Sequence, residues 1–209
     1  MKTYFLFTFS IIVLFFSCKK DESQQNNIPI IPIKTGNSWT TIDSNFQVEN
    51  GKSLKITYTV TIGDSIQING QKGFKKYYSA KKDHAFIINN DSEGNLISIG
   101  GISNTDTLTT KPSIMYKKKA KKDESWISEI LSYDSKTFKS FNLTTKLTKT
   151  DTIIKTKIGD FKCNVYMDTS YSAEINYHYI SIGTGEIKYE KFKNGILVYN
   201  KTLTSYILK

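Results

Sequence analysis

The sequence predicts an all-β fold: an antiparallel meander of two similar halves that forms a curved sheet or partial barrel, with little helix after the signal peptide. Residues 52–62 alternate apolar and polar side chains over five periods, as a half-buried strand does. Asn69-Gly70 and Asn194-Gly195 are dipeptides that favour tight hairpins. No window after the N-terminal run carries a sustained stripe with the 3.6-residue period of a helix.

The strand at 52–62 has the clearest pattern. Its apolar positions are Leu54, Ile56, Tyr58, Val60 and Ile62, and we expect them to face the core. By the same reasoning we expect strands at 39–48, 74–80, 85–89, 96–102, 126–133, 138–147, 152–157, 161–169, 172–182, 186–192 and 197–208. Turn signals between them include Gly63-Asp64 and Gly183 to Gly185. Short loops imply antiparallel neighbours.

The strands belong to a single predicted domain, 35–209, that contains a faint internal repeat. The two stretches are about 36–110 and 123–209. Each begins near a Ser-Trp pair, and Trp39 and Trp126 lie 87 positions apart, as do Phe74 and Phe161. A duplicated meander explains the shared offset, and chance alignment of aromatic residues is the alternative.

The N-terminus has the features of an export signal, which we assign to residues 1–17. Lys2 supplies a positive charge, and residues 4–16 form an apolar run too short to span a bilayer comfortably. A small residue, Ser17, stands directly before Cys18, which resembles the lipobox of bacterial lipoproteins. The resemblance implies cleavage before Cys18 and lipidation of its thiol and amine with acyl chains, enough for stable anchoring. The alternative is a transmembrane anchor with an incidental thiol.

Residues 18–34 are predicted to be the lipidated N-terminus and a flexible tether. The stretch Lys19, Lys20, Asp21 and Glu22 resembles a surface-export signal of Bacteroidota lipoproteins, so we expect a lipid-anchored, surface-exposed protein of the outer membrane. Two prolines, Pro29 and Pro32, favour extended backbone near the domain. Fully extended, the tether would hold the domain about 50 Å from the lipid.

The net charge of +10 is typical of proteins with anionic partners, but all 29 basic residues are lysine. Without arginine, the chain lacks the bidentate contacts on which specific nucleic-acid readers rely, so nucleic acid is not the expected partner. The densest run is Lys117, Lys118, Lys119, Lys121 and Lys122. We interpret it either as a patch for the anionic groups of lipopolysaccharide, capsule or nucleic acid, or as a solvated connector between the halves.

No residue pattern predicts catalysis, a metal site or a cofactor, and we expect a protein that is not an enzyme. Alternation places Cys163 in the core, where burial makes the thiol inert. His84 and His178 stand in different halves without a local motif for nucleophile or zinc chemistry. Glu186 and Glu190 share a strand, and the pattern predicts a shared face, but no second feature of glycosidase chemistry accompanies them.

The spacing of several motifs resembles a family of uncharacterised secreted bacterial lipoproteins of Bacteroidota type, with repeated Gly-x-x-Trp β-meander halves. The matching segments are Gly36 to Trp39, Lys111-Pro112 through Trp126, Gly159-Asp160-Phe161 and Gly183-Thr184-Gly185-Glu186-Ile187, with Asp123 where the second Gly-x-x-Trp would have glycine. The resemblance supports the repeat and implies no chemistry.

Two functional hypotheses follow. The first is a non-catalytic, lipid-anchored envelope protein that binds an envelope protein, a glycan or another unidentified ligand. The alternative is a carrier or sensor of a lipid-like ligand held in a curved-sheet cavity. An apolar cavity lined from both halves would favour the carrier, whereas a filled core would favour the binding module.

Overall fold

The computed structural model describes residues 28–46, 53–79, 81–169 and 174–209. These residues form twelve strands and no helix, and none of their segments is a helix long and apolar enough to cross a membrane. The strands are β1 (Ser38–Asn45), β2 (Leu54–Ile68), β3 (Gln71–Tyr78), β4 (Lys81–Asn90), β5 (Leu96–Ser103), β6 (Thr107–Tyr116), β7 (Ser125–Asp134), β8 (Thr137–Thr156), β9 (Gly159–Thr169), β10 (Glu174–Ser181), β11 (Gly185–Lys193) and β12 (Ile196–Ile207). The predictions for the signal peptide, Cys18, Lys19, Lys20, Asp21 and Glu22 lie outside the described residues.

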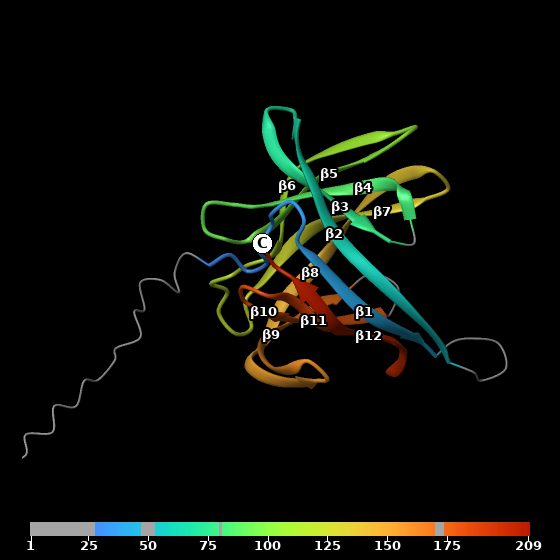
Figure 1. The fold of residues 1–209 in the computed structure, drawn as a ribbon. Coiled ribbons are helices and arrows are strands. Elements are labelled where there is room, and N and C mark those ends of the chain that lie inside the picture. Colours follow the sequence, from blue (N-terminus) through green and yellow to red (C-terminus); the bar gives the residue numbers. More distant parts are fainter. Residues whose placement is uncertain (1–27, 47–52, 80, 170–173) are drawn as a thin grey trace, which may run out of the picture.

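All twelve strands belong to one antiparallel sheet in the order β6-β5-β4-β3-β2-β1-β12-β11-β10-β9-β8-β7. The chain therefore builds the sheet outward from β1 to one edge, crosses to β7 at the other edge, and returns inward until β12 pairs with β1. Figure 1 shows the sheet curving until its two edges approach each other. The predicted fold class, an all-β antiparallel meander that forms a curved sheet or partial barrel, is confirmed, and the sheet is nearly closed. The origin of the two six-stranded halves by duplication stays a prediction.

The edge strands β6 and β7 are joined through side chains. The indole Nε1 of Trp126 donates to the Ile114 carbonyl at 3.1 Å, and Ser128 Oγ donates to the same oxygen at 2.8 Å. The Glu129 amide donates to Ser113 Oγ at 2.6 Å. These contacts satisfy backbone groups that an open edge would expose, which protects the sheet from pairing with other chains.

One strand was not predicted, and two predictions were wrong in extent. The strand that was not predicted is β6; it contains Pro112, and proline is tolerated there because β6 is an edge strand. The predicted turn at Gly63-Asp64 is a bulge within the single strand β2. The predicted strands 138–147 and 152–157 are one 20-residue strand, β8, whose register shifts on both sides of Lys149. Bulges carry the long strands around the curve of the sheet.

The tight turns follow the predicted dipeptides. Asn69 and Gly70 have φ values of 49° and 76°, the left-handed pair that a two-residue hairpin requires. Ser135 and Lys136 adopt the same pair, at 51° and 67°, between β7 and β8 without any glycine. Backbone pairing of the flanking strands imposes this conformation where the dipeptide alone would not predict it.

Residues 28–34, which we call the strap, pack into the domain. Ile30 is fully buried in the main core, and its amide donates to the Gly94 carbonyl at 2.9 Å. The Gly183 amide donates to the carbonyls of Pro29 and Ile30, so the strap bridges the β4–β5 and β10–β11 turns. The prediction that the flexible tether extends to residue 34 is therefore corrected: its last seven residues belong to the folded domain. A predicted tether of residues 18–27 would span at most about 33 Å when fully extended.

Candidate ligand-binding cavity

The inside of the curved sheet is hollow toward one end. A cavity of about 500 Å³, the outer compartment, is lined by strands β1–β4 on one side and by β7 and β12 on the other. Its lining residues are Thr41, Asp43, Asn45, Leu54, Ile56, Tyr58, Val60, Tyr78, His84, Phe86, Ser132, Tyr133, Tyr199 and Lys201. The side chains of both predicted halves thus meet around one largely apolar and aromatic space.

A second space of about 200 Å³, the inner compartment, adjoins the first and shares Thr41, Val60, Tyr78 and Lys201 with it. The strap residues Ile31 and Ile33 contribute to its wall. Together the compartments fall in the size range of small-molecule sites. The strap therefore forms part of the cavity wall as well as part of the core.

The alternating residues of β2 line this cavity, as the pattern predicted for an inward face. They are not fully packed: Leu54 is 50% exposed and Ile56 is 39% exposed, although both belong to the lining. Leu54 begins β2 and Asn45 ends β1, so the mouth lies at this end of the sheet. The strap lies at the opposite end, beside the start of β1. The cavity consequently opens at the end of the domain opposite the strap.

A row of polar side chains, one from each strand β7 to β12, crosses the inner face. We call it the polar belt: Ser128, Thr145, Asp168, His178, Glu186 and Lys201. Ser128 Oγ lies 2.8 Å from Thr145 Oγ1, which donates to Asp168 Oδ1 at 2.9 Å. His178 then bridges two carboxylates, with Nε2 2.8 Å from Asp168 Oδ2 and Nδ1 2.7 Å from Glu186 Oε1. Glu186 also pairs with Lys201. Each buried charge therefore has a partner on the next strand.

The carboxylates hold His178 in its charged form. Burial alone would disfavour the imidazolium, but Asp168 and Glu186 outweigh it and raise the pKa of His178 to about 9. The Tyr116 hydroxyl, on β6, lies 2.8 Å from His178 Nδ1. With both ring nitrogens engaged, His178 provides a fixed positive charge at neutral pH.

Glu186 and Lys201 stabilise each other's charged forms in the same way. Burial opposes ionisation of Glu186, but Lys201 and His178 hold its pKa well below the usual range. Burial also opposes the charge on Lys201, yet the carboxylate of Glu186 raises its pKa. On the other side of Lys201, Asp43 accepts hydrogen bonds from Thr41 and from the Tyr199 hydroxyl.

The predicted placement of Cys163 is confirmed. The side chain is 1% exposed, and burial raises the pKa of the thiol to about 12. The two histidines remain separate: His84 is stacked on Tyr133 with ring centroids 3.9 Å apart in the outer compartment, while His178 lines the inner one. Among the described residues, no group of three or more His, Cys, Asp or Glu side chains is arranged to hold a metal ion.

The prediction that Glu186 and Glu190 share a face was wrong. The register of β10 with β11 shifts, so that Tyr179 pairs with Lys188 and the next residue, Ile180, pairs with Glu186. This bulge turns Glu186 into the cavity beside Tyr189, and it leaves Glu190 on the other face with Tyr179 and Lys188. The two carboxylates therefore do not form an acid pair.

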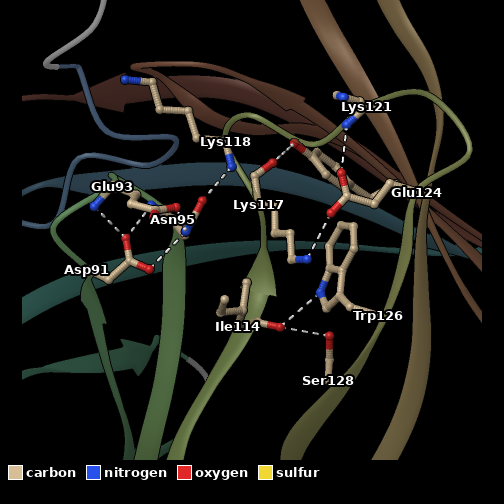
Figure 2. A network of polar contacts seen from close by, with 11 residues as sticks. Asp91, Glu93, Asn95, Ile114, Lys117, Lys118, Lys121, Glu124, Trp126 and Ser128 are labelled. Atoms are coloured by element: carbon tan, nitrogen blue, oxygen red, sulfur yellow. Dashed lines mark hydrogen bonds and ion pairs between the residues drawn. The ribbon is translucent and has the colours of Figure 1, made fainter.

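The lysine run forms the connection between β6 and β7 (Figure 2). Its first member, Lys117, donates to Glu124 Oε1 at 2.9 Å and lies 5.0 Å from the centroid of the Trp126 ring. The backbone amides of Lys118 and Lys121 donate to Asn95 Oδ1 and Glu124 Oε2. Lys119, Lys121 and Lys122 are exposed. The run is thus an ordered connector, and the anion-binding role of its exposed members stays a prediction.

Sequence reasoning identified His178 and Glu186 as single residues but missed the polar belt. A usable signal exists in β12, where Lys201 stands at an inward position between Tyr199 and Leu203. Asp168 likewise follows the buried Tyr166 at a spacing of two in β9. A charged residue at a core position of a strand predicts a buried partner, but not which strand supplies it.

The fold and the cavity define a class: an all-β, nearly closed antiparallel meander with an interior cavity. No protein-family model and no curated protein sequence matches this chain. Two solved structures are similar to it. One is described as a "putative exported protein with YmcC-like fold" from Bacteroides fragilis NCTC 9343; it has 10% identity and a TM-score of 0.48, over 87% of this chain and 100% of that one.

The other is described as a "putative lipoprotein" from Parabacteroides distasonis ATCC 8503, with 13% identity and a TM-score of 0.47, over 86% of this chain and 99% of that one. At these values, membership of the lipoprotein family that the motifs resemble stays a prediction.

Proposed function

We propose that this chain is a lipid-anchored envelope protein that carries or senses a hydrophobic ligand in its interior cavity, without catalysing a reaction on it. One observation carries the proposal: the outer compartment of about 500 Å³ is lined from both halves and leaves apolar side chains such as Leu54 half exposed inside it. Apolar surface kept out of the packed core is costly unless a ligand covers it. The carrier hypothesis is therefore favoured over the binding module.

The titratable groups of the cavity support a binding role. Because its pKa is about 9, His178 is charged at neutral pH, and its two carboxylate partners occupy both ring nitrogens. A general base near neutral pH needs a pKa close to 7 and a free lone pair. Envelope location rests on the export signal at residues 1–17 and on Cys18.

A binding titration tests the proposal. The fluorescent fatty acid 11-(dansylamino)undecanoic acid is added to the chain from Lys19 to Lys209, which keeps every described residue. We expect saturable binding with a blue-shifted emission. Ile56→Trp fills part of the outer compartment at a site with room for the larger side chain, and it should weaken binding about tenfold.

The matched control is Ile127→Trp, because Ile127 is 63% exposed and lies outside the cavity lining. It should bind the probe like the parent chain. The proposal is overturned if the parent chain does not bind the probe, or if Ile56→Trp, with an unchanged circular dichroism spectrum, binds it as well as the control.

A further inference from the structure

The junction of the two compartments carries two lysines and a tyrosine. Tyr78 and Lys201 line both compartments, and Lys76 lines the inner one. Lys76 and Tyr78 are two apart on β3, and the Lys76 ammonium lies 5.1 Å from the centroid of the Tyr78 ring. Lys201 reaches the same place from β12. Cationic groups from two separate parts of the sheet therefore converge on one point of the cavity wall.

The two lysines differ in their partners. Lys201 is paired with Glu186, and Asp43 stands directly opposite it on β1. Within the described ranges of the chain, by contrast, no carboxylate oxygen lies within 4.0 Å of Lys76 Nζ. An ammonium group that is partly withdrawn from water gains from a nearby anion. The Lys76 charge is thus available to a ligand.

The pKa of the Tyr78 hydroxyl reflects the electrostatic potential at the junction of the two compartments. Burial would raise the pKa of this phenol, yet Lys76 and Lys201 together lower it below the ordinary value of 10.0. The neighbouring tyrosines Tyr116, Tyr189 and Tyr199 all have raised pKa values, because burial and nearby carboxylates disfavour their ionised forms. A negative charge is therefore favoured beside Tyr78 and disfavoured beside the other three phenols.

We propose that the ligand is an amphiphile with one anionic head group, a carboxylate or a phosphate, that binds at Lys76, Tyr78 and Lys201 with its hydrocarbon part in the outer compartment. This deepens the proposed function and rests on it. The lysines can donate to the head-group oxygens, and the Tyr78 hydroxyl adds a third donor. The hydrocarbon part would lie along Ile56, Tyr58 and Phe86 toward the mouth.

Calorimetric titration with four ligands of equal chain length tests the head-group assignment: dodecanoate, monododecyl phosphate, dodecan-1-ol and dodecylammonium. We expect one of the two anions to bind at least tenfold more tightly than the alcohol, and the ammonium to bind most weakly. The tighter anion identifies the head group as carboxylate or phosphate. Lys76→Met, which keeps most of the aliphatic stem, should weaken binding of that anion about tenfold and leave binding of the alcohol unchanged.

The control is Lys55→Met, because Lys55 stands between the lining residues Leu54 and Ile56 on β2 and therefore faces outward. It should leave all four affinities unchanged. The inference is overturned, while the proposed function survives, if the alcohol or the ammonium binds as tightly as both anions, or if Lys76→Met and Lys55→Met behave alike. Failure of all four ligands to bind the parent chain overturns the proposed function itself.

Discussion

Truncation of Ile30 in the strap should lower the free energy of unfolding substantially, although this residue lies near the N-terminal end of the domain. Its side chain is fully buried in the main core beside Trp39 and Ile62. Ile30→Ala removes three carbon atoms, worth about 2.4 kcal/mol at about 0.8 kcal/mol for each buried methylene. The cavity left behind adds to this loss, so we expect a decrease of about 3 kcal/mol in the free energy of unfolding.

Urea denaturation followed by tryptophan fluorescence measures the effect, since Trp39 lies in the same core cluster. The matched control is Ile196→Ala, because Ile196 is 68% exposed at the start of β12 and should lose less than about 1 kcal/mol. If both variants lost the same small amount, the strap would not be part of the folded domain, and the original prediction of a tether reaching residue 34 would be restored.

Three further predictions concern the polar belt, the buried thiol and the lysine run. The raised pKa of His178, about 9 when folded against 6.5 when unfolded, contributes stability that is complete below pH 6.5 and is lost as pH rises through 9. The free energy of unfolding should therefore fall by up to about 3 kcal/mol between pH 6 and pH 10. The His178→Gln variant should lack this fall, so that the stability difference between the parent and the variant changes with pH. A stability difference that is constant with pH would contradict the raised pKa of His178. Cys163 should resist a maleimide at pH 8 in the folded protein and react fully in urea, whereas rapid labelling of the folded chain would show an exposed thiol. Changing Lys119, Lys121 and Lys122 together to Gln should weaken heparin binding and reduce its salt dependence. Lys117→Gln should instead lower the free energy of unfolding, because Lys117 is paired with Glu124. Equal heparin binding by the triple variant and the parent chain would exclude the anion-binding patch.

The sequence was informative where local rules decide the outcome. The alternation over 52–62 placed Leu54, Ile56 and Val60 on the inner face, and the Asn-Gly dipeptides marked two hairpins, because side-chain period and left-handed φ are properties of a few neighbouring residues. The same rules failed at β6, where tolerance of Pro112 depends on the edge position, which only the whole sheet defines.

The site was less predictable, since it depends on contacts between distant strands. His178 carries no local motif, and its partners Asp168 and Glu186 come from the two strands that flank β10. A one-residue bulge decides that Glu186, and not Glu190, faces the cavity. Alternation also predicts which side chains point inward, but it does not predict whether they fill the interior or leave a space of about 500 Å³.

Methyl NMR with a spin-labelled fatty acid tests the central claim, occupancy of the cavity, most directly. With isoleucine and valine methyl groups labelled, the account predicts strong broadening of the signals of Ile56 and Val60, which line the outer compartment, on addition of 16-doxyl-stearate. The signals of Ile127 and Ile153, exposed outside the lining, should remain sharp. Broadening of Ile127 and Ile153 with unaffected Ile56 and Val60 would place the ligand on the outer surface and contradict the account.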